Sequence, residues 1–205
     1  MTIHTGPNAR TLIFMAAIAS GLIACSNPPG PTAADLNVSY ETALAETADA
    51  ADFAPGEDAA ALERLEAYFA DMTPASVAET RSIYADRAVL YDNLAVVTGA
   101  KNIEAYFAKA AGEVDGLQVQ FEQVSRTGID YYIRWKMIIT SEGLSPGEPL
   151  ISYGVTHFRF DDDGRVLLHR DFWDAATGLY EYLPWIGDMI TRLRVMLGEQ
   201  PRDEG

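Results

Sequence analysis

Cysteine, histidine and basic side chains are scarce in this sequence. Its 205 residues include one Cys and three His, and 15 Lys and Arg stand against 30 Asp and Glu, for a formal net charge of −15. A single cysteine excludes a disulfide bond within the chain. The negative charge argues against nucleic acid as a partner, because phosphate binding needs a concentrated basic surface.

Motifs for nucleophilic, phosphate and metal chemistry are also lacking. The sequence has no serine or cysteine nucleophile motif and no Gly-rich phosphate loop. A metal site could draw only on His157, His169 and Asp171, and both histidines would first have to share a face. We therefore expect neither a metal ion nor a cofactor.

The N-terminus carries an apolar run, "TLIFMAAIASGLIA" at 11–24, whose length suits a signal-peptide core and is too short to span a bilayer comfortably. It ends in "LIAC", which resembles the bacterial lipobox. The resemblance implies cleavage before Cys25 and a membrane anchor on that cysteine, with simple secretion as the alternative. Ser26 resembles the outer-membrane sorting pattern, which implies the periplasmic side of that membrane. Loss of Arg10 would change the formal charge from −15 to −16.

Composition divides the rest of the chain. Residues 26–58 contain four prolines and seven acids with no Lys or Arg, so we expect 25–57 to be an acidic tether, with at most a marginal helix over 40–50. One ordered domain is expected over 58–178. Residues 179–205 read as an amphipathic helix and tail that packs on the domain or closes a cavity mouth. A homodimer contact or a membrane-surface contact is the alternative for that helix.

Hydrophobic periodicity predicts an α+β domain. Helical spacing over 57–72, 73–86 and 98–114 surrounds a short strand at 88–93, and period two begins at Leu117. Strands are expected over 117–124, 130–140, 150–160 and 165–174, so helices precede a long antiparallel sheet. A curved sheet wrapped on helices leaves a cone-shaped interior of the kind that often holds a ligand.

Polar residues in the last predicted hairpin, 156–174, suggest a site. Alternation places His169, Asp171 and Trp173 on one face, opposite Arg170 and Phe172. An aspartate in an apolar cavity has a raised pKa, which suits proton transfer near neutral pH. Asp171 is therefore the leading catalytic candidate. Its alternative is a structural pair with an arginine.

Three further residues are catalytic candidates. Asp92 follows a strand and is either a pocket base or a turn-forming acid. His157 is either a proton shuttle or a histidine on the outer face, because Phe158 and Phe160 lie on the opposite side of its strand. Tyr68 lies on an apolar helical stripe and is either a site tyrosine or a core residue.

Two stretches carry a family resemblance: "YADRAVLYDNLAVVTGAKNIEAYFAKA" (84–110) and "HFRFDDDGRVLLHRDFWD" (157–174). With the order of elements, they resemble the SnoaL-like and ketosteroid-isomerase-like branch of the nuclear-transport-factor-2-like superfamily over about 58–178. The resemblance implies a cone-shaped, curved antiparallel or mixed sheet wrapped on N-terminal helices, here with an extra C-terminal helix. That fold hosts cyclases, isomerases, epoxide hydrolases, dehydratases and non-catalytic binders, so it implies no single activity.

The resemblance also assigns roles to residues. Ketosteroid isomerases would place their general base at Asp92 and their oxyanion-holding tyrosine at Tyr68. Thr156 stands where their protonated aspartate lies, which argues against steroid isomerisation. SnoaL-type cyclases would use Asp171 with His157.

Limonene epoxide hydrolases share the aspartate matched by Asp171. They also need an arginine-x-aspartate pair on the third strand, where this chain has Arg134 and Lys136. The hydrolase assignment therefore lacks one of its acids.

Three functions stay open at this point. The first is an envelope-anchored binder of a small apolar molecule. The second is an isomerase, cyclase or dehydratase that moves a proton without a cofactor. The third is a non-catalytic interaction module of the envelope. Residues expected to contact the ligand are Trp135, Tyr153, Thr156, His169 and Trp173.

Overall fold

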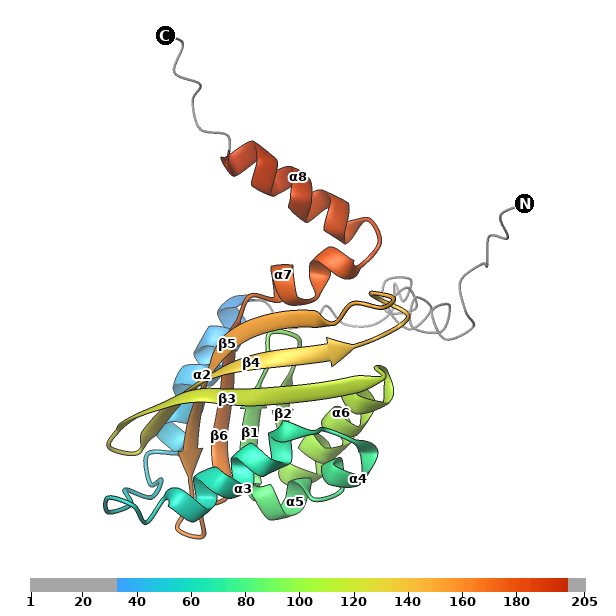
Figure 1. The fold of residues 1–205 in the computed structure, drawn as a ribbon. Coiled ribbons are helices and arrows are strands. Elements are labelled where there is room, and N and C mark those ends of the chain that lie inside the picture. Colours follow the sequence, from blue (N-terminus) through green and yellow to red (C-terminus); the bar gives the residue numbers. More distant parts are fainter. Residues whose placement is uncertain (1–32, 199–205) are drawn as a thin grey trace, which may run out of the picture.

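A computed structural model describes residues 33–198, so the predicted signal peptide and Cys25 lie outside the described part of the chain. Its strands form one mixed six-stranded sheet in the order β2-β1-β6-β5-β4-β3 (Figure 1). The strands are β1 Tyr84–Tyr91, β2 Val96–Thr98, β3 Gly116–Thr127, β4 Asp130–Thr140, β5 Leu150–Phe160 and β6 Val166–Trp173. The helices are α2 Ala33–Glu46, α3 Ala59–Ala70, α4 Pro74–Val77, α5 Thr80–Ile83, α6 Ala100–Gly112, α7 Ala175–Gly178, η1 Tyr180–Tyr182 and α8 Ile186–Gly198. The predicted α+β class is confirmed.

The sheet joins segments that are distant in sequence. Strands β3 to β6 form an antiparallel meander, and β1 pairs in parallel with β6 through Leu90 opposite His169. Asp92 directly follows β1, and Asp171 lies two residues after His169 on β6. The parallel pairing therefore brings both candidate acids to the same end of two neighbouring strands.

Helices α3 to α6 cover the inner face of the sheet. Leu65, Tyr68 and Phe69 of α3 are buried, as the helical spacing predicts, and they join Ile103 and Phe107 of α6 in the main core. A capping box at Thr73 and Ser76 begins α4, with Pro74 at the first helical position. This packing sets α3 and α6 against the inner face of the sheet and brings Tyr106 of α6 to Asp92.

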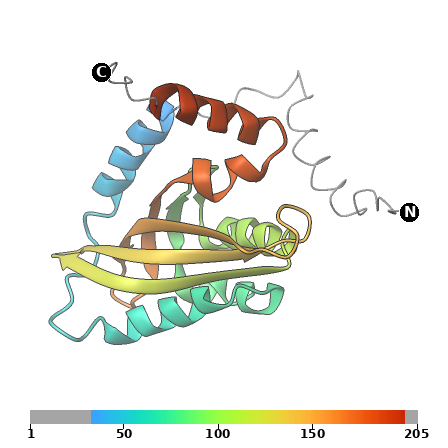
Figure 2. The same ribbon diagram turned by 45° about the horizontal axis from the view of Figure 1, so that its top comes forward.

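Helix α2 covers the opposite face of the sheet, and Figure 2 shows it across the strands from α3. Ala43 is 2% exposed and packs with Val89, Tyr91 and Leu168. Part of the expected 25–57 tether is therefore a docked helix. The sequence pattern missed it because few residues of α2 pack on the sheet, namely the small Ala43 and the partly buried Tyr40 and Leu44, and these give a weak hydrophobic periodicity.

Polar contacts fix α2 to the sheet. The Tyr40 hydroxyl lies 2.8 Å from Nδ1 of His157, whose Nε2 lies 2.7 Å from Asp130. A carboxylate can only accept, so Nε2 donates and Nδ1 of the neutral ring accepts from Tyr40. Arg159 also donates to Asp130 and to the carbonyl of Leu44. His157 thus belongs to the outer face, beneath α2.

Helix α8 extends away from the sheet and packs mainly on η1 (Figure 1). Its predicted amphipathic pattern is present, but much of the apolar side faces solvent. The exposed apolar residues here are Trp185, Met189, Leu193, Val195, Met196 and Leu197. Within residues 33–198, no helix is long and apolar enough to cross a membrane.

The burial of His157 predicts a pH-dependent stability. Burial lowers its pKa below 6.5, and this effect outweighs the nearby Asp130 carboxylate. As the pH falls below about 6.5, His157 takes up a proton in the unfolded chain but stays neutral in the folded chain until a lower pH. Stability should therefore fall on acidification, by at most about 1.4 kcal/mol per pH unit from this residue.

Urea unfolding at pH 7.5 and pH 5.5, with His157→Gln as the comparison, measures this contribution. A glutamine can donate to Asp130 and accept from Tyr40 without titrating. The variant should therefore lose less stability between the two pH values than the parent protein does. An equal loss in both proteins would contradict the assignment of the neutral ring.

Candidate functional site

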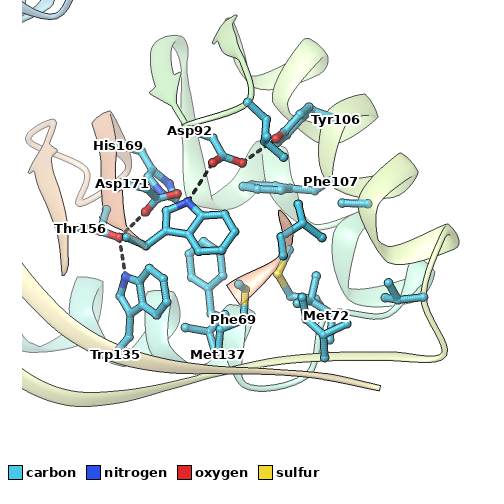
Figure 3. A pocket seen from close by; sticks show the side chains of 18 of the residues that line it. Phe69, Met72, Asp92, Tyr106, Phe107, Trp135, Met137, Thr156, His169 and Asp171 are labelled. Atoms are coloured by element: carbon cyan, nitrogen blue, oxygen red, sulfur yellow. Dashed lines mark hydrogen bonds and ion pairs between the residues drawn. The ribbon is translucent and has the colours of Figure 1, made fainter. Parts of the chain in front are cut away.

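A cavity of about 480 Å³ lies between the inner face of the sheet and the helices α3 and α6 (Figure 3). Its walls are predominantly aromatic and aliphatic, whereas two carboxylates occupy one end. Exposed Leu94 and Lys109 belong to the lining and mark where the cavity meets solvent. The apolar walls include Phe69, Met72, Phe107, Leu117, Val119, Phe121, Met137, Ile139 and Phe158.

Asp171 accepts two hydrogen bonds on one carboxylate oxygen. The register of β5 and β6 sets Thr156 opposite Asp171, and the threonine hydroxyl donates to Oδ1. Trp135 Nε1 donates to the same hydroxyl over 2.8 Å, so the threonine proton is left to point at Asp171. Trp135 lies directly over Gly154, where a Cβ atom would overlap the indole ring. A glycine at that position thus fixes the indole above the threonine.

The second donor to Asp171 is His169. Its Nε2 lies 2.9 Å from Oδ1 of Asp171, and its Nδ1 lies 2.7 Å from the hydroxyl of Tyr84. Because a carboxylate oxygen accepts, Nε2 donates to Asp171, and Nδ1 faces the hydroxyl of Tyr84. Tyr84 is fully buried, and burial raises the pKa of its hydroxyl well above 10. The chain Tyr84–His169–Asp171 is therefore oriented from the core toward the cavity.

Asp92 accepts one hydrogen bond on each oxygen. Tyr106 of α6 donates to Oδ2 over 2.6 Å, and Trp173 Nε1 donates to Oδ1 over 3.2 Å. The next residue, Asn93, donates to the carbonyl of Trp173 and ties the end of β1 to the end of β6. The helix α6 and the two strands therefore meet at this carboxylate.

The two acids perturb one another. Burial raises the pKa of Asp92, and the negative charge of Asp171 raises it further, against the lowering effect of the donors Tyr106 and Trp173. The pKa of Tyr106 is also raised, first by burial and then by the Asp92 charge. Asp92 thus keeps its proton to a higher pH than an ordinary aspartate does, while two donors hold Asp171 as an acceptor.

The structure brings together most of the predicted site residues. Those that line the cavity are Asp92, Trp135, Thr156, His169, Asp171 and Trp173. Figure 3 labels all of these except Trp173. The alternation of β6 therefore predicted the correct face for His169, Asp171 and Trp173. Their roles in binding or catalysis remain predictions.

Three predicted site residues lie elsewhere. His157 faces α2 because residues adjacent on a strand point to opposite faces, and Phe158 points into the cavity. Tyr68 is a core residue whose hydroxyl lies 2.6 Å from Thr80. Tyr153 is 56% exposed and lies outside the cavity lining. The expected proton-shuttle role of His157 and the oxyanion role of Tyr68 therefore do not fit this cavity.

Two residues gained significance only from the structure. Tyr106 lies within the helix predicted over 98–114, and its hydrogen bond to Asp92 follows from the packing of α6 against β1. Asp174, one of the polar residues of the hairpin, caps α7 by accepting from the backbone N–H groups of Ala176 and Thr177. Among the described residues, no group of three or more His, Cys, Asp or Glu side chains is placed to hold a metal ion.

Comparison with known proteins agrees with the fold described above. The family model for the SnoaL-like domain matches residues 65–169. A protein with a ketosteroid isomerase-like fold from Catenulispora acidiphila, solved with trimethylamine, is 16% identical with a TM-score of 0.51, covering 62% of this chain and 92% of its own. No curated protein matches the sequence.

Two further solved structures resemble the chain at a lower TM-score of 0.49. One is a candidate SnoaL-like polyketide cyclase from Jannaschia sp. CCS1, which is 20% identical and covers 63% of this chain and 98% of its own. The other is an LEH-like epoxide hydrolase from M. tuberculosis, which is 15% identical and covers 68% of this chain and 96% of its own.

The raised pKa of Asp92 predicts that Asp92→Asn stabilises the protein. At neutral pH a buried carboxylate with a raised pKa disfavours folding, because the charge is better solvated in the unfolded chain. Asparagine can accept from Trp173 and donate to the Tyr106 hydroxyl, so its amide is satisfied. The variant should show a higher Tm at pH 8, by roughly 2–4 °C for each kcal/mol gained.

The comparison at pH 4 serves as the control for Asp92→Asn, since a raised pKa leaves the native aspartate largely neutral there. The difference in Tm between variant and parent should shrink at that pH. A Tm lowered by the substitution at pH 8 would contradict the raised pKa.

Proposed function

The chain belongs to the SnoaL-like domain family, and from that premise we propose that it binds a small apolar molecule in the cavity and exchanges a proton with it through Asp92 and Asp171. One observation carries this proposal: the cavity walls are predominantly apolar, and a carboxylate pair lies at one end, away from the charged residues Lys109 and Glu113 of the exposed rim. The cavity volume of about 480 Å³ is within the range of small-molecule sites. The hydrogen-bond donors differ between the two acids: Tyr106 and Trp173 donate to Asp92, and Thr156 and His169 donate to Asp171.

The two aspartates suit different roles in such an exchange. Burial and the charge of Asp171 raise the pKa of Asp92, which favours its protonated form, so Asp92 suits the role of proton donor. Asp171, oriented by Thr156 and His169, can accept a proton. A proton donor and a proton acceptor in one cavity are the minimum that an isomerase, cyclase or dehydratase requires.

The test of binding is native mass spectrometry of the protein purified gently from its host, before and after filling the cavity with a bulky side chain. Met137→Trp adds volume inside the cavity, whereas Ile138→Trp adds the same side chain at the next residue of β4, outside the lining. An apolar adduct should be present in the parent protein and in Ile138→Trp, and absent from Met137→Trp. Absence from all three proteins would favour the interaction module instead.

Proton exchange is tested on the molecule so identified, by following deuterium uptake from D₂O. With the molecule at saturating concentration, Asp92→Asn and Asp171→Asn should slow the exchange by about 100-fold or more. Unchanged exchange in both variants would leave a binder without acid–base chemistry.

We also propose that the protein is anchored to the bacterial envelope through an acylated Cys25. The apolar run at 11–24 and the "LIAC" stretch support this, and single acyl chains bind membranes only marginally, so stable anchoring takes more than one. Metabolic labelling with radioactive palmitate should mark the parent protein and its neighbouring control Ser26→Ala. Cys25→Ala should remain unlabelled and leave the membrane fraction. A labelled Cys25→Ala protein would contradict the anchor.

A further inference from the structure

The two carboxylates of the cavity lack a cationic partner in the protein. Among residues 33–198, no lysine or arginine pairs with Asp92 or Asp171; their hydrogen-bond donors are Tyr106, Trp173, Thr156 and His169. A buried carboxylate is costly unless an opposite charge and hydrogen bonds compensate it. Here hydrogen bonds are present and the opposite charge is missing.

The nearest arginine in sequence points the other way. Arg170 precedes Asp171 on β6, and its guanidinium lies over the rings of Tyr40, Tyr91 and Phe172 on the outer face. The alternative predicted for Asp171 was a structural ion pair with an arginine. Arg170 does not form this pair, because it lies on the other face of the sheet. Lys109, which also lines the cavity, is exposed at its rim.

The donors at the polar end are already engaged. Tyr106 and Trp173 donate to Asp92, Thr156 and His169 donate to Asp171, and Trp135 donates to Thr156. Each proton that could otherwise bind a carbonyl oxygen or a carboxylate on a ligand therefore points at a protein oxygen. An anionic ligand would meet the carboxyl pair with no free donor from this set.

The walls next to the carboxylates are aromatic. Trp173 and Tyr106 direct their N–H and O–H groups at Asp92, and Trp135 directs its N–H at Thr156, so the polar edges of these rings face the acid end. A bare metal ion is a poor fit, because Mg²⁺ and Ca²⁺ need six or more oxygen ligands and the wall is otherwise apolar. An organic cation with a hydrocarbon body matches both parts of the cavity.

We propose that the ligand is a hydrophobic amine in its ammonium form, with its charge at the Asp92–Asp171 end and its apolar body against the walls of the cavity. This inference rests on the proposed function, whose ligand it assigns to a chemical class. The ammonium supplies the positive charge that no described lysine or arginine supplies to Asp92 and Asp171. Its N–H groups can donate to carboxylate oxygens, which accept more than one hydrogen bond each.

Three probes with a similar skeleton test the assignment: 4-phenylbutylamine, 4-phenylbutan-1-ol and 4-phenylbutyrate. Titration calorimetry on the full chain at pH 8, with tryptophan fluorescence as a second readout, measures each affinity. The amine should bind at least about tenfold more tightly than the alcohol, as a charge-assisted contact implies, and the carboxylate should bind least.

Variants test whether amine binding depends on Asp92 and Asp171 in particular or on the negative charge of the protein in general. Asp171→Asn and Asp92→Asn should each weaken amine binding by about tenfold and leave the alcohol within about twofold. Glu113→Gln removes an acid that lines the exposed rim and should leave all affinities within about twofold. Circular dichroism measures whether each variant folds. If one of the two aspartate variants fails to fold, the other still tests the proposal.

The outcomes distinguish the two proposals. Equal binding of amine and alcohol, or tighter binding of the carboxylate, overturns the ammonium assignment and leaves an apolar cavity that binds small molecules. An amine preference that Glu113→Gln abolishes as strongly as Asp171→Asn also overturns it. Failure of all three probes to bind counts against the proposed function itself.

Discussion

Two carboxylates held in an apolar cavity are the constraint on which the rest of this structure depends. Each acid is partly buried and therefore relies on hydrogen bonds from the protein, and the donors come from α6, β5 and β6. None of these elements could supply the site alone. The packing of α6 against the sheet and the register of the last hairpin are therefore conditions of the site as much as of the fold.

The two faces of the sheet divide the charged residues between them. On β5 and β6, Thr156, His169 and Asp171 face the cavity, whereas His157 and Arg170 face α2. The outer face contains guanidinium groups and a neutral histidine under a helix, and the inner face contains acids among aromatic rings. This separation keeps the arginines away from the aspartates and gives the cavity its negative character.

The fold and most of the cavity wall could be predicted from sequence patterns, because the alternation of residues along a strand is a local property. It placed His169, Asp171 and Trp173 on one face and indicated that His157 opposes Phe158. Strand alternation could not predict contacts between distant elements, such as the hydrogen bond from Tyr106 to Asp92. The docking of α2 was missed for a different reason, since the few residues of α2 that pack on the sheet, such as Ala43, leave little periodic signal. Resemblance alone put Tyr68 in a site that its bond to Thr80 excludes.

The parallel pairing of β1 with β6 has a consequence for how the chain acquires its shape. Leu90 meets His169 across most of the domain sequence, so closing that pair carries the loop entropy of a long intervening chain. Contacts of this kind slow folding relative to the local meander of β3 to β6. During synthesis the first strand must wait for the last one to emerge from the ribosome. The carboxylate pair therefore comes into being only when the final strand is added, so no partly made chain displays it.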